Sequence, residues 1–384
     1  MAAAKKGTCS VSFSGYYLYM RIVHLESGRH LYGGAQQVCY LLAGLAAEGI
    51  DNVLVCPRDS AIANTVSGYG GVEVIQIPIG GDLDFALSGR LRRLFEAHQP
   101  SLVHVHSRRG VDLFGGWNAR WTGVPAILTR RVESAEYKLL AYIKYWPYAA
   151  IIAISRAIKE QLKEKVGGLE DRIYHVASGI EADRYRPAPP SGHLTKLFNL
   201  PGDTFKIGIV AQLIERKGHA RLFEVLPELI KAHPAVRVLC FGQGPLEGKL
   251  RQQIDDLGLA EKVRFAGFRD DLATLLPDLD CLVHVPDREG LGVAVLEALS
   301  CGLPVLTSAV GGLVDMIEHE STGLLVNLNE DGALLEALRR IVQDGTLRAR
   351  LGSAARKQVE AEFSADRMIR GNLSVYRTVL ERKI

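Results

Sequence analysis

The stretch DREGLGVAVLEA, residues 287–298, follows the apolar run CLVHV, residues 281–285. The apolar run predicts a buried strand, and the second stretch predicts a helix with two glycines just before it. Glycines at such a turn let backbone N–H groups approach an anion at the positive end of the helix. This stretch therefore predicts an α/β sheet with a phosphate site where the strand gives way to the helix.

Short β-rich apolar runs alternate with helical patterns on both sides of this stretch. The runs are 21–25, 53–56, 74–77, 102–106, 126–128 and 151–154 in the first half, and 206–210, 236–241, 263–266, 281–285 and 305–307 in the second. Helical patterns include 34–48, 219–232 and 293–299. Such alternation is typical of parallel sheets covered by helices, so we expect two doubly wound, Rossmann-like domains.

A proline-rich stretch divides the two halves. Residues 187–192 cannot continue a helix or a central strand, which predicts a linker between an N-terminal domain, 20–186, and a C-terminal domain, 193–362. We expect a final helix within 363–384, returning to the N-terminal domain, and an extension outside the fold at 1–19. Doubly wound domains bind ligands at the carboxyl ends of their strands, so we expect the site in a cleft between the domains.

The composition is that of a globular enzyme. The 384 residues suffice for two domains, and 47% hydrophobic with 23% charged residues is typical of α/β enzymes. The net charge of +3 favours no nucleic-acid partner, and six cysteines without a C-x-x-C pair indicate a reducing compartment. No run approaches the ~18 apolar residues of a spanning helix. We expect a cytoplasmic protein, with peripheral contact to the inner membrane left open.

Two carboxylates frame the predicted phosphate site. Glu289 stands before the helix and Glu297 about two turns into it, so at ~1.5 Å per residue their backbones are roughly 10 Å apart. They cannot both flank one bond closely, but they can hold hydroxyls at opposite ends of an extended ligand with a diphosphate between them. A nucleotide sugar has this shape. On spacing alone, two solvated helix-end carboxylates remain the alternative.

These residues resemble the E-x7-E motif of retaining GT-B glycosyltransferases, family 4 in particular. Residues 298–305 and 310–312, with Asp315 in the acidic position, are similar to two further segments of that family, and the resemblance covers nearly the whole chain after residue 19. It implies the GT-B fold, with two Rossmann-like domains, an interdomain cleft and a C-terminal helix. It also implies a nucleotide-sugar donor and a saccharide or glycolipid acceptor.

The resemblance assigns roles to the residues of the motif. By this resemblance Glu289 binds the donor sugar and Glu297 the ribose, while the amides of Gly290, Leu291 and Gly292 meet the phosphate.

A second element, residues 207–218, resembles the G-R-L-x-x-x-K-G loop of the family. A lysine on such a loop can neutralise a diphosphate that gains charge as the sugar leaves, and we assign this catalytic role to Lys217. The usual arginine of the family is Gln212 here. One of the two expected cations is thus absent from that position or supplied elsewhere, as by Arg216.

Further donor and substrate contacts follow from weaker matches. Gly244 lies in a segment that resembles the G-x-G-P turn, and Phe268 and Arg269 lie in one that resembles the nucleobase-side loop. The pair Gly33-Gly34 resembles the N-terminal glycine loop over the donor phosphate. His106, at the end of the run 102–106, resembles the cleft histidine of the family and is our third candidate catalytic residue beside Lys217 and Glu289; a hydrogen-bonded structural histidine is the alternative.

Arginine pairs follow two predicted strands of the first half. Arg108-Arg109 and Arg130-Arg131, together with the aromatic and basic region 137–148, could bind an anionic acceptor or a lipid surface. Packing combined with solvation is the alternative. The D-x-D pairs at 82–84 and 278–280 are not near the phosphate-type loops, so we expect no metal and no cofactor beyond the donor substrate.

The resemblance thus implies a glycosyltransferase that retains the configuration of the sugar. The arginines of the N-terminal half favour a phosphorylated or lipid-linked saccharide as acceptor, as in the synthesis of lipopolysaccharide or another envelope glycan. Two alternatives stay open: a sugar-nucleotide epimerase of the same fold, and a non-catalytic nucleotide-sugar-binding protein.

Overall fold

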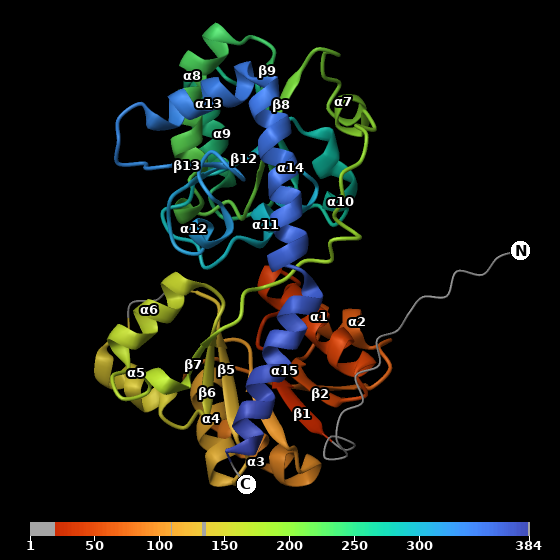
Figure 1. Cartoon of the computed structure of the whole chain (residues 1–384), viewed down its shortest axis with the longest axis vertical. Helices are drawn as coiled ribbons and strands as arrows, with labels where there is room; N and C mark the ends of the chain where they lie inside the picture. The colour runs from red at the N-terminus through yellow and green to blue at the C-terminus, as the bar shows by residue number, and fades with distance from the viewer. Residues whose placement is uncertain (1–19, 109, 133–135, 383–384) are drawn as a thin grey trace, which may run out of the picture.

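The computed structural model describes residues 20–108, 110–132 and 136–382. Figure 1 shows two α/β domains stacked along the long axis of the molecule, with the chain crossing between them twice. Each domain is built on a parallel sheet with helices on both faces. The predicted fold of two Rossmann-like domains is therefore confirmed.

The N-terminal domain contains a seven-stranded parallel sheet within its described residues. Its spatial order is β3 (Val72–Ile77), β2 (Asp51–Pro57), β1 (Arg21–Leu25), β4 (Leu102–Val105), β5 (Ala126–Arg130), β6 (Ala150–Ala153) and β7 (Ile173–His175). The helices are α1 (Gly33–Ala47), α2 (Ala61–Val66), α3 (Ala86–His98), α4 (Val111–Trp121), α5 (Lys138–Tyr145) and α6 (Arg156–Lys165).

The C-terminal domain repeats this plan with a six-stranded parallel sheet. Its order is β10 (Val263–Gly267), β9 (Val236–Phe241), β8 (Phe205–Val210), β11 (Cys281–His284), β12 (Val305–Ser308) and β13 (Leu324–Val326). Its helices are α7 (His193–Leu197), α8 (His219–Ala232), α9 (Glu247–Asp256), α10 (Leu272–Leu275), α11 (Val293–Ser300), α12 (Leu313–Met316), α13 (Ala333–Gln343) and α14 (Gly345–Glu362).

The central strands are buried on both faces, as their continuous apolar sequences predict. Every residue of β4, β6, β11 and β12 is buried. The edge strands β7 and β13 were not predicted, since three residues are too few for a periodic pattern to emerge.

Two helices at the C-terminus connect the domains. In Figure 1, α14 and α15 (Ala365–Glu381), in blue, run from the upper domain down along the lower one. The side chain of Ser364 caps α15 by accepting a hydrogen bond from the amide of Arg367, and Ile180 bridges to Ser364 where the other interdomain segment passes. The two crossing segments are thus tied together, and α15 packs against α1 of the N-terminal domain.

The strand order reverses at one point in each sheet, between β1 and β4 and between β8 and β11. Ligands of doubly wound sheets bind at the carboxyl ends of the strands at such points. The loops after β1 and β8 accordingly carry residues that face the space between the domains.

Candidate active site

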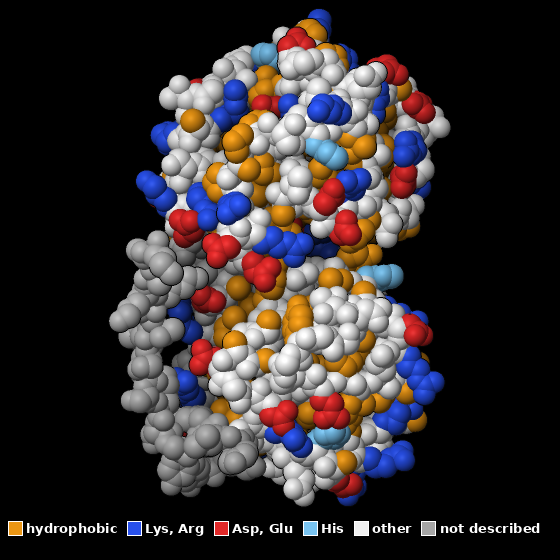
Figure 2. Space-filling view, turned by 90° about the vertical axis from the view of Figure 1, so that its right-hand side faces the viewer, with side chains coloured by type: hydrophobic (Ala, Val, Ile, Leu, Met, Phe, Trp, Pro, Cys, Tyr) orange, Lys and Arg blue, Asp and Glu red, His pale blue; other side chains and the backbone are white. Residues whose placement is uncertain are grey.

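A cleft of about 650 Å³ lies between the two domains and is lined by residues of both. Figure 2 shows the constriction between the domains, where acidic and basic side chains gather. The N-terminal domain contributes the start of α1 and Arg131, and the C-terminal domain contributes the loops after β8, β9 and β11. The cleft therefore brings together the loops that the sequence singled out in both halves.

The start of α11 faces this cleft. Gly292 precedes the helix with φ of 90°, in the left-handed region that favours glycine, and Gly292, Val293 and Ala294 line the cleft. The first turn of a helix leaves backbone N–H groups without acceptors in the helix itself. These groups and the positive helix end make this a favourable place for an anion.

The start of α1 lies opposite, in the other domain. A Cβ atom placed on Gly33 would stand 3.0 Å from Cγ2 of Val293, so the first residues of α1 and α11 are nearly in contact across the cleft. Gly34 also lines the cleft, close to the side chain of Arg131. Two helix N-termini thus converge on the same space, which strengthens its preference for negative charge.

A cluster of three charged or polar side chains borders the α11 turn. Nζ of Lys217, on the loop after β8, forms an ion pair with Oε2 of Glu289. Nε2 of His284, the last residue of β11, lies 2.9 Å from the same oxygen. All three side chains are largely or fully buried, so the cluster is a preorganised unit rather than a set of mobile surface charges.

The pKa of Glu289 reflects this environment. Desolvation alone would raise it, but the hydrogen bond from His284 and the positive charge of Lys217 outweigh desolvation and hold the pKa well below its usual range. Burial lowers the pKa of His284, so its ring is neutral near pH 7 and can donate one hydrogen bond to the carboxylate. Glu289 is therefore a carboxylate at any physiological pH and can accept hydrogen bonds from hydroxyl groups of a ligand.

Glu297, in the second turn of α11, has a pKa shifted in the opposite direction. It is 8% exposed, and desolvation raises its pKa to about 7, although the Tyr185 hydroxyl and Arg184 oppose the shift. The two glutamates of the motif thus differ in charge state near neutral pH. Both line the cleft, Glu289 before the start of α11 and Glu297 within that helix.

Other predicted donor residues also line the cleft. These are Gln212, Arg216, Phe268, Arg269 and Leu291. Gly290 and Gly244 are not among the described residues that line the cleft. Gly290 instead packs against the Arg131 carbonyl. From the predicted G-x-G-P turn, Gly242 rather than Gly244 lines the cleft. The contacts of all these residues with a donor remain predictions.

His106 is 2% exposed and is not among the described residues that line the cleft. Its Nε2 is 2.9 Å from Nδ1 of His24, and Nε2 of His24 is 3.1 Å from Oδ1 of Asn52. The side-chain amide of Asn52 donates to the Ile50 carbonyl, so Oδ1 of Asn52 accepts a hydrogen bond from Nε2–H of His24. Nδ1 of His24 in turn accepts a hydrogen bond from Nε2–H of His106. Contact of His106 with a substrate stays a prediction. In this structure the side chain of His106 is buried and hydrogen-bonded to His24.

His24, His104 and His106 form a group within the described residues that could hold a metal ion. Both nitrogens of His104 already have partners, the hydroxyls of Tyr376 and Thr129. Burial lowers the pKa of all three rings, which keeps them neutral. The group holds two separate sets of hydrogen bonds: His104 links β4 to Thr129 of β5 and to Tyr376 of α15, whereas His24 links His106 to Asn52 of β2.

The two arginines at the end of β5 diverge. Arg131 reaches the cleft, where burial lowers its pKa to about 10 although Glu26 opposes the shift. Arg130 turns the other way and pairs with Glu136 at 3.2 Å. Arg108 is exposed outside the described lining of the cleft, and Arg109 lies outside the described residues. Of the three predicted acceptor arginines that the structure describes, Arg131 alone lines the cleft.

Both D-x-D pairs have structural partners. Asp84 pairs with Arg90, and Asp278 accepts hydrogen bonds from the backbone of Ser191, Gly192 and Leu194, which fixes the end of the linker. Among the described helices, none combines the length and the low charge that a membrane crossing requires.

The chain matches two family models that together cover both domains. Residues 32–184 match Glycosyltransferase Family 4, and residues 195–358 match Glycosyl transferases group 1. The structure of Anabaena HepE in complex with UDP and glucose has a TM-score of 0.83 to this chain at 19% identity, covering 94% of this chain and 100% of the other, so the fold is shared.

Two curated relatives align with this chain over different shares of their length. A GDP-mannose-dependent monoacylated alpha-(1-6)-phosphatidylinositol monomannoside mannosyltransferase of Corynebacterium glutamicum is 32% identical over 51% of this chain, which spans about half, 54%, of that protein. The lipopolysaccharide core biosynthesis glycosyltransferase LpsD of Rhizobium meliloti is 30% identical over 90% of this chain and 94% of LpsD. With both domains matched and a relative aligned over nearly its full length, the chain belongs to the family 4, group 1 glycosyltransferases.

Proposed function

We propose that the protein transfers a sugar, with retention of configuration, from a nucleotide-sugar donor to a saccharide or glycolipid acceptor. The observation that carries this proposal is the meeting of Lys217, Glu289 and the start of α11 on one side of a cleft whose other side is the start of α1. A diphosphate has the charge and the length to lie between the two helix ends. LpsD, the relative aligned over nearly the whole chain, supports an acceptor in lipopolysaccharide or another envelope glycan.

In the proposed reaction the bond between the sugar C1 and the diphosphate oxygen breaks, and its electron pair stays on the phosphate. The acceptor hydroxyl forms the new bond to C1 on the same face, and its proton goes to the leaving phosphate oxygen. The amides of α11 and the ammonium group of Lys217 stabilise the charge that develops on the diphosphate. Glu289 holds sugar hydroxyls, and Glu297 holds the ribose.

Glu289 is poorly suited to act as a covalent nucleophile. Its Oε2 is already engaged by Lys217 and His284. A carboxylate held in this way has less charge to offer to C1. Its Oε1 accepts the amide of Gly290 at 3.2 Å and can accept a further hydrogen bond from a ligand. This supports transfer on one face without a glycosyl-enzyme intermediate.

Peripheral contact with a membrane surface is part of the proposal. The α5 region exposes large apolar side chains next to Lys138, with Tyr137 83% exposed and Leu139 71% exposed. Aromatic and aliphatic side chains beside a cation are typical of interfacial segments. Flotation with anionic and with neutral vesicles tests this contact, and Leu139→Ser with Leu140→Ser should reduce recovery with anionic vesicles.

A donor panel tests the main proposal. UDP-, GDP- and ADP-sugars are added to the full chain, and a donor that binds the native state raises the melting temperature. The same donor is then incubated with lipopolysaccharide or truncated cores, and product is followed by mass spectrometry. Transfer with the anomeric configuration retained supports the proposal. Conversion of the donor to an epimer without transfer, or donor binding without any turnover on any acceptor, would contradict it.

A further inference from the structure

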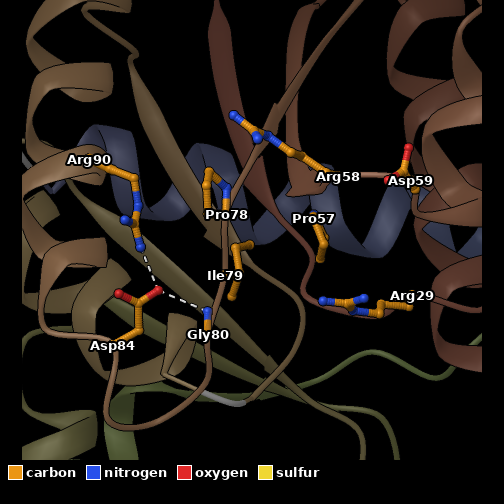
Figure 3. Close-up of a pocket in the computed structure, with 9 residues that line it drawn as sticks. All are labelled: Arg29, Pro57, Arg58, Asp59, Pro78, Ile79, Gly80, Asp84 and Arg90. Atoms are coloured by element: carbon orange, nitrogen blue, oxygen red, sulfur yellow. Dashed lines mark hydrogen bonds and ion pairs between the residues drawn. The ribbon is translucent and has the colours of Figure 1, made fainter.

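A second pocket lies in the N-terminal domain, at the carboxyl ends of β2 and β3. Its volume is about 550 Å³. Figure 3 shows that three separate segments supply its arginines: Arg29 from the loop before α1, Arg58 from the end of β2, and Arg90 from α3. Arg29 and Arg58 are exposed, and Arg90 is partly buried.

Only one of these arginines is neutralised by a close carboxylate. Arg90 pairs with Asp84, and the same carboxylate accepts a hydrogen bond from the amide of Gly80 at 2.8 Å. Within the described residues, no side-chain hydrogen bond or ion pair is found for the guanidinium groups of Arg29 and Arg58. The remaining acid of the pocket, Asp59, leaves the lining with three cations against two anions.

The pocket adjoins the interdomain cleft. Leu31 and Tyr32, which line the cleft, follow Arg29 by two and three residues, so their backbones are at most about 7 to 11 Å from it. The Arg29 carbonyl accepts the amide of Ala61 at 2.9 Å, which fixes this loop to the start of α2. An anion held at Arg29 and Arg58 would therefore lie beside the N-terminal, acceptor side of the cleft.

The other wall of the pocket is also held in place. A Cβ atom on Gly110 would stand 2.5 Å from the carbonyl oxygen of Gly81, so the 80–81 turn packs tightly on the start of α4. The Asp84 carboxylate connects the two segments, because it accepts a hydrogen bond from the Gly80 amide and forms an ion pair with Arg90. The pocket is thus formed before any ligand binds, which lowers the entropic cost of binding.

We propose that this pocket binds a phosphate or diphosphate group carried by the acceptor, with Arg29 and Arg58 as its direct ligands. The inference rests on the proposed function, since it assumes that the N-terminal side of the cleft receives the acceptor. It assigns the anion to residues other than the arginine pairs at 108–109 and 130–131. The planar guanidinium groups can each donate two hydrogen bonds to one phosphate.

The test uses the variant Arg29→Gln/Arg58→Gln in the full chain. Its matched control is Arg92→Gln/Arg93→Gln, which removes the same charge from exposed positions of α3 outside the pocket lining. Binding of glucose 6-phosphate is measured by calorimetry, and binding of vesicles containing phosphatidic acid by flotation. These two probes distinguish a soluble sugar phosphate from a lipid-linked phosphate.

We expect at least one probe to bind the wild type and the control alike and to bind the pocket variant about tenfold or more weakly, as loss of charged hydrogen bonds implies. Binding should persist in Lys217→Ala, which alters the donor site instead. Equal binding to the pocket variant and the control, or no binding of either probe to the wild type, would overturn the inference.

The donor assay keeps this result separate from the proposed function. Thermal shifts with UDP and GDP should be the same in the pocket variant and in the wild type, because neither arginine lines the cleft. Failure of the pocket test with intact donor shifts would reject only the phosphate pocket, whereas absence of donor shifts in the wild type would reject the proposed function.

Discussion

Nε2 of His284 lies 2.9 Å from Oε2 of Glu289, the oxygen that also pairs with Nζ of Lys217. His284 is the last residue of β11, and five residues of chain return to bring Glu289 over its ring. The histidine at the end of β11 and the lysine on the loop after β8 thus contact the same carboxylate oxygen. Together they hold the Glu289 side chain in place.

Replacing His284 should make donor binding sensitive to acid. In His284→Leu the pKa of Glu289 rises, because the hydrogen bond that lowers it is lost. Protonation then competes with ligand binding as pH falls, whereas the wild type keeps its carboxylate ionised. We expect donor affinity measured by calorimetry to fall more steeply toward acidic pH in His284→Leu, and His284→Gln, which retains a donor group, to behave more like the wild type. Parallel pH profiles for all three proteins would argue against this role.

Lys217→Ala should reduce the transfer rate about 10²- to 10³-fold, the usual cost of losing one preorganised group that stabilises developing charge. Its effect should be larger on kcat than on KM for the donor, since the diphosphate gains charge in the transition state. Lys249→Ala, at an exposed position of α9, is the control and should leave both constants unchanged. Equal rates for the two variants would exclude Lys217 from the reaction.

The sequence predicted the parts of this site that depend on local pattern. Apolar runs located the central strands of both sheets, and the glycine turn before residue 293 located the start of α11. His284 was missed because it stands inside an apolar run and reads as part of a strand. Its position as the one charged or polar member of that run, five residues before Glu289, was the available signal.

Features set by tertiary contacts were harder to predict. The register of β1 and β4 sets His24 opposite His104, and the ring of His24 also shares a buried hydrogen bond with His106, just after β4. No local pattern could have predicted this hydrogen bond. Arg130 and Arg131 differ because successive residues at a strand end point to opposite sides. The pocket of Arg29, Arg58 and Arg90 combines segments far apart in the chain, which no local pattern brings together.

Gly290→Ala should separate the two domains at the cleft. A Cβ atom there would stand 2.2 Å from the carbonyl oxygen of Arg131, a backbone atom of the other domain that cannot move alone. We expect transfer to fall about tenfold or more and the radius of gyration in X-ray scattering to increase. Gly248→Ala on α9, whose Cβ atom would meet nothing within 4 Å, is the control and should leave both the transfer rate and the radius of gyration unchanged. Unchanged activity in Gly290→Ala would show that the close approach is not needed for transfer.

The Glu297 carboxyl should make the free energy of unfolding depend on pH, because its pKa differs between the unfolded chain and the folded protein. In the unfolded chain the carboxyl titrates near its ordinary value of 4.5, while in the folded protein desolvation raises its pKa to about 7. The folded state therefore binds more protons in this window, and its stability falls as pH rises from 4.5 through about 7.

Glu297→Gln removes this dependence but keeps an acceptor for the Tyr185 hydroxyl. At a pH above 7 the variant should be more stable than the wild type by up to about 3 kcal/mol, and the difference should vanish toward pH 4.5. Urea denaturation across this range measures the effect, with Glu224→Gln on the exposed face of α8 as the control. A constant difference between Glu297→Gln and the wild type at every pH would mean that the carboxyl titrates alike in the folded and unfolded states, because linkage requires the two curves to converge once both states are protonated.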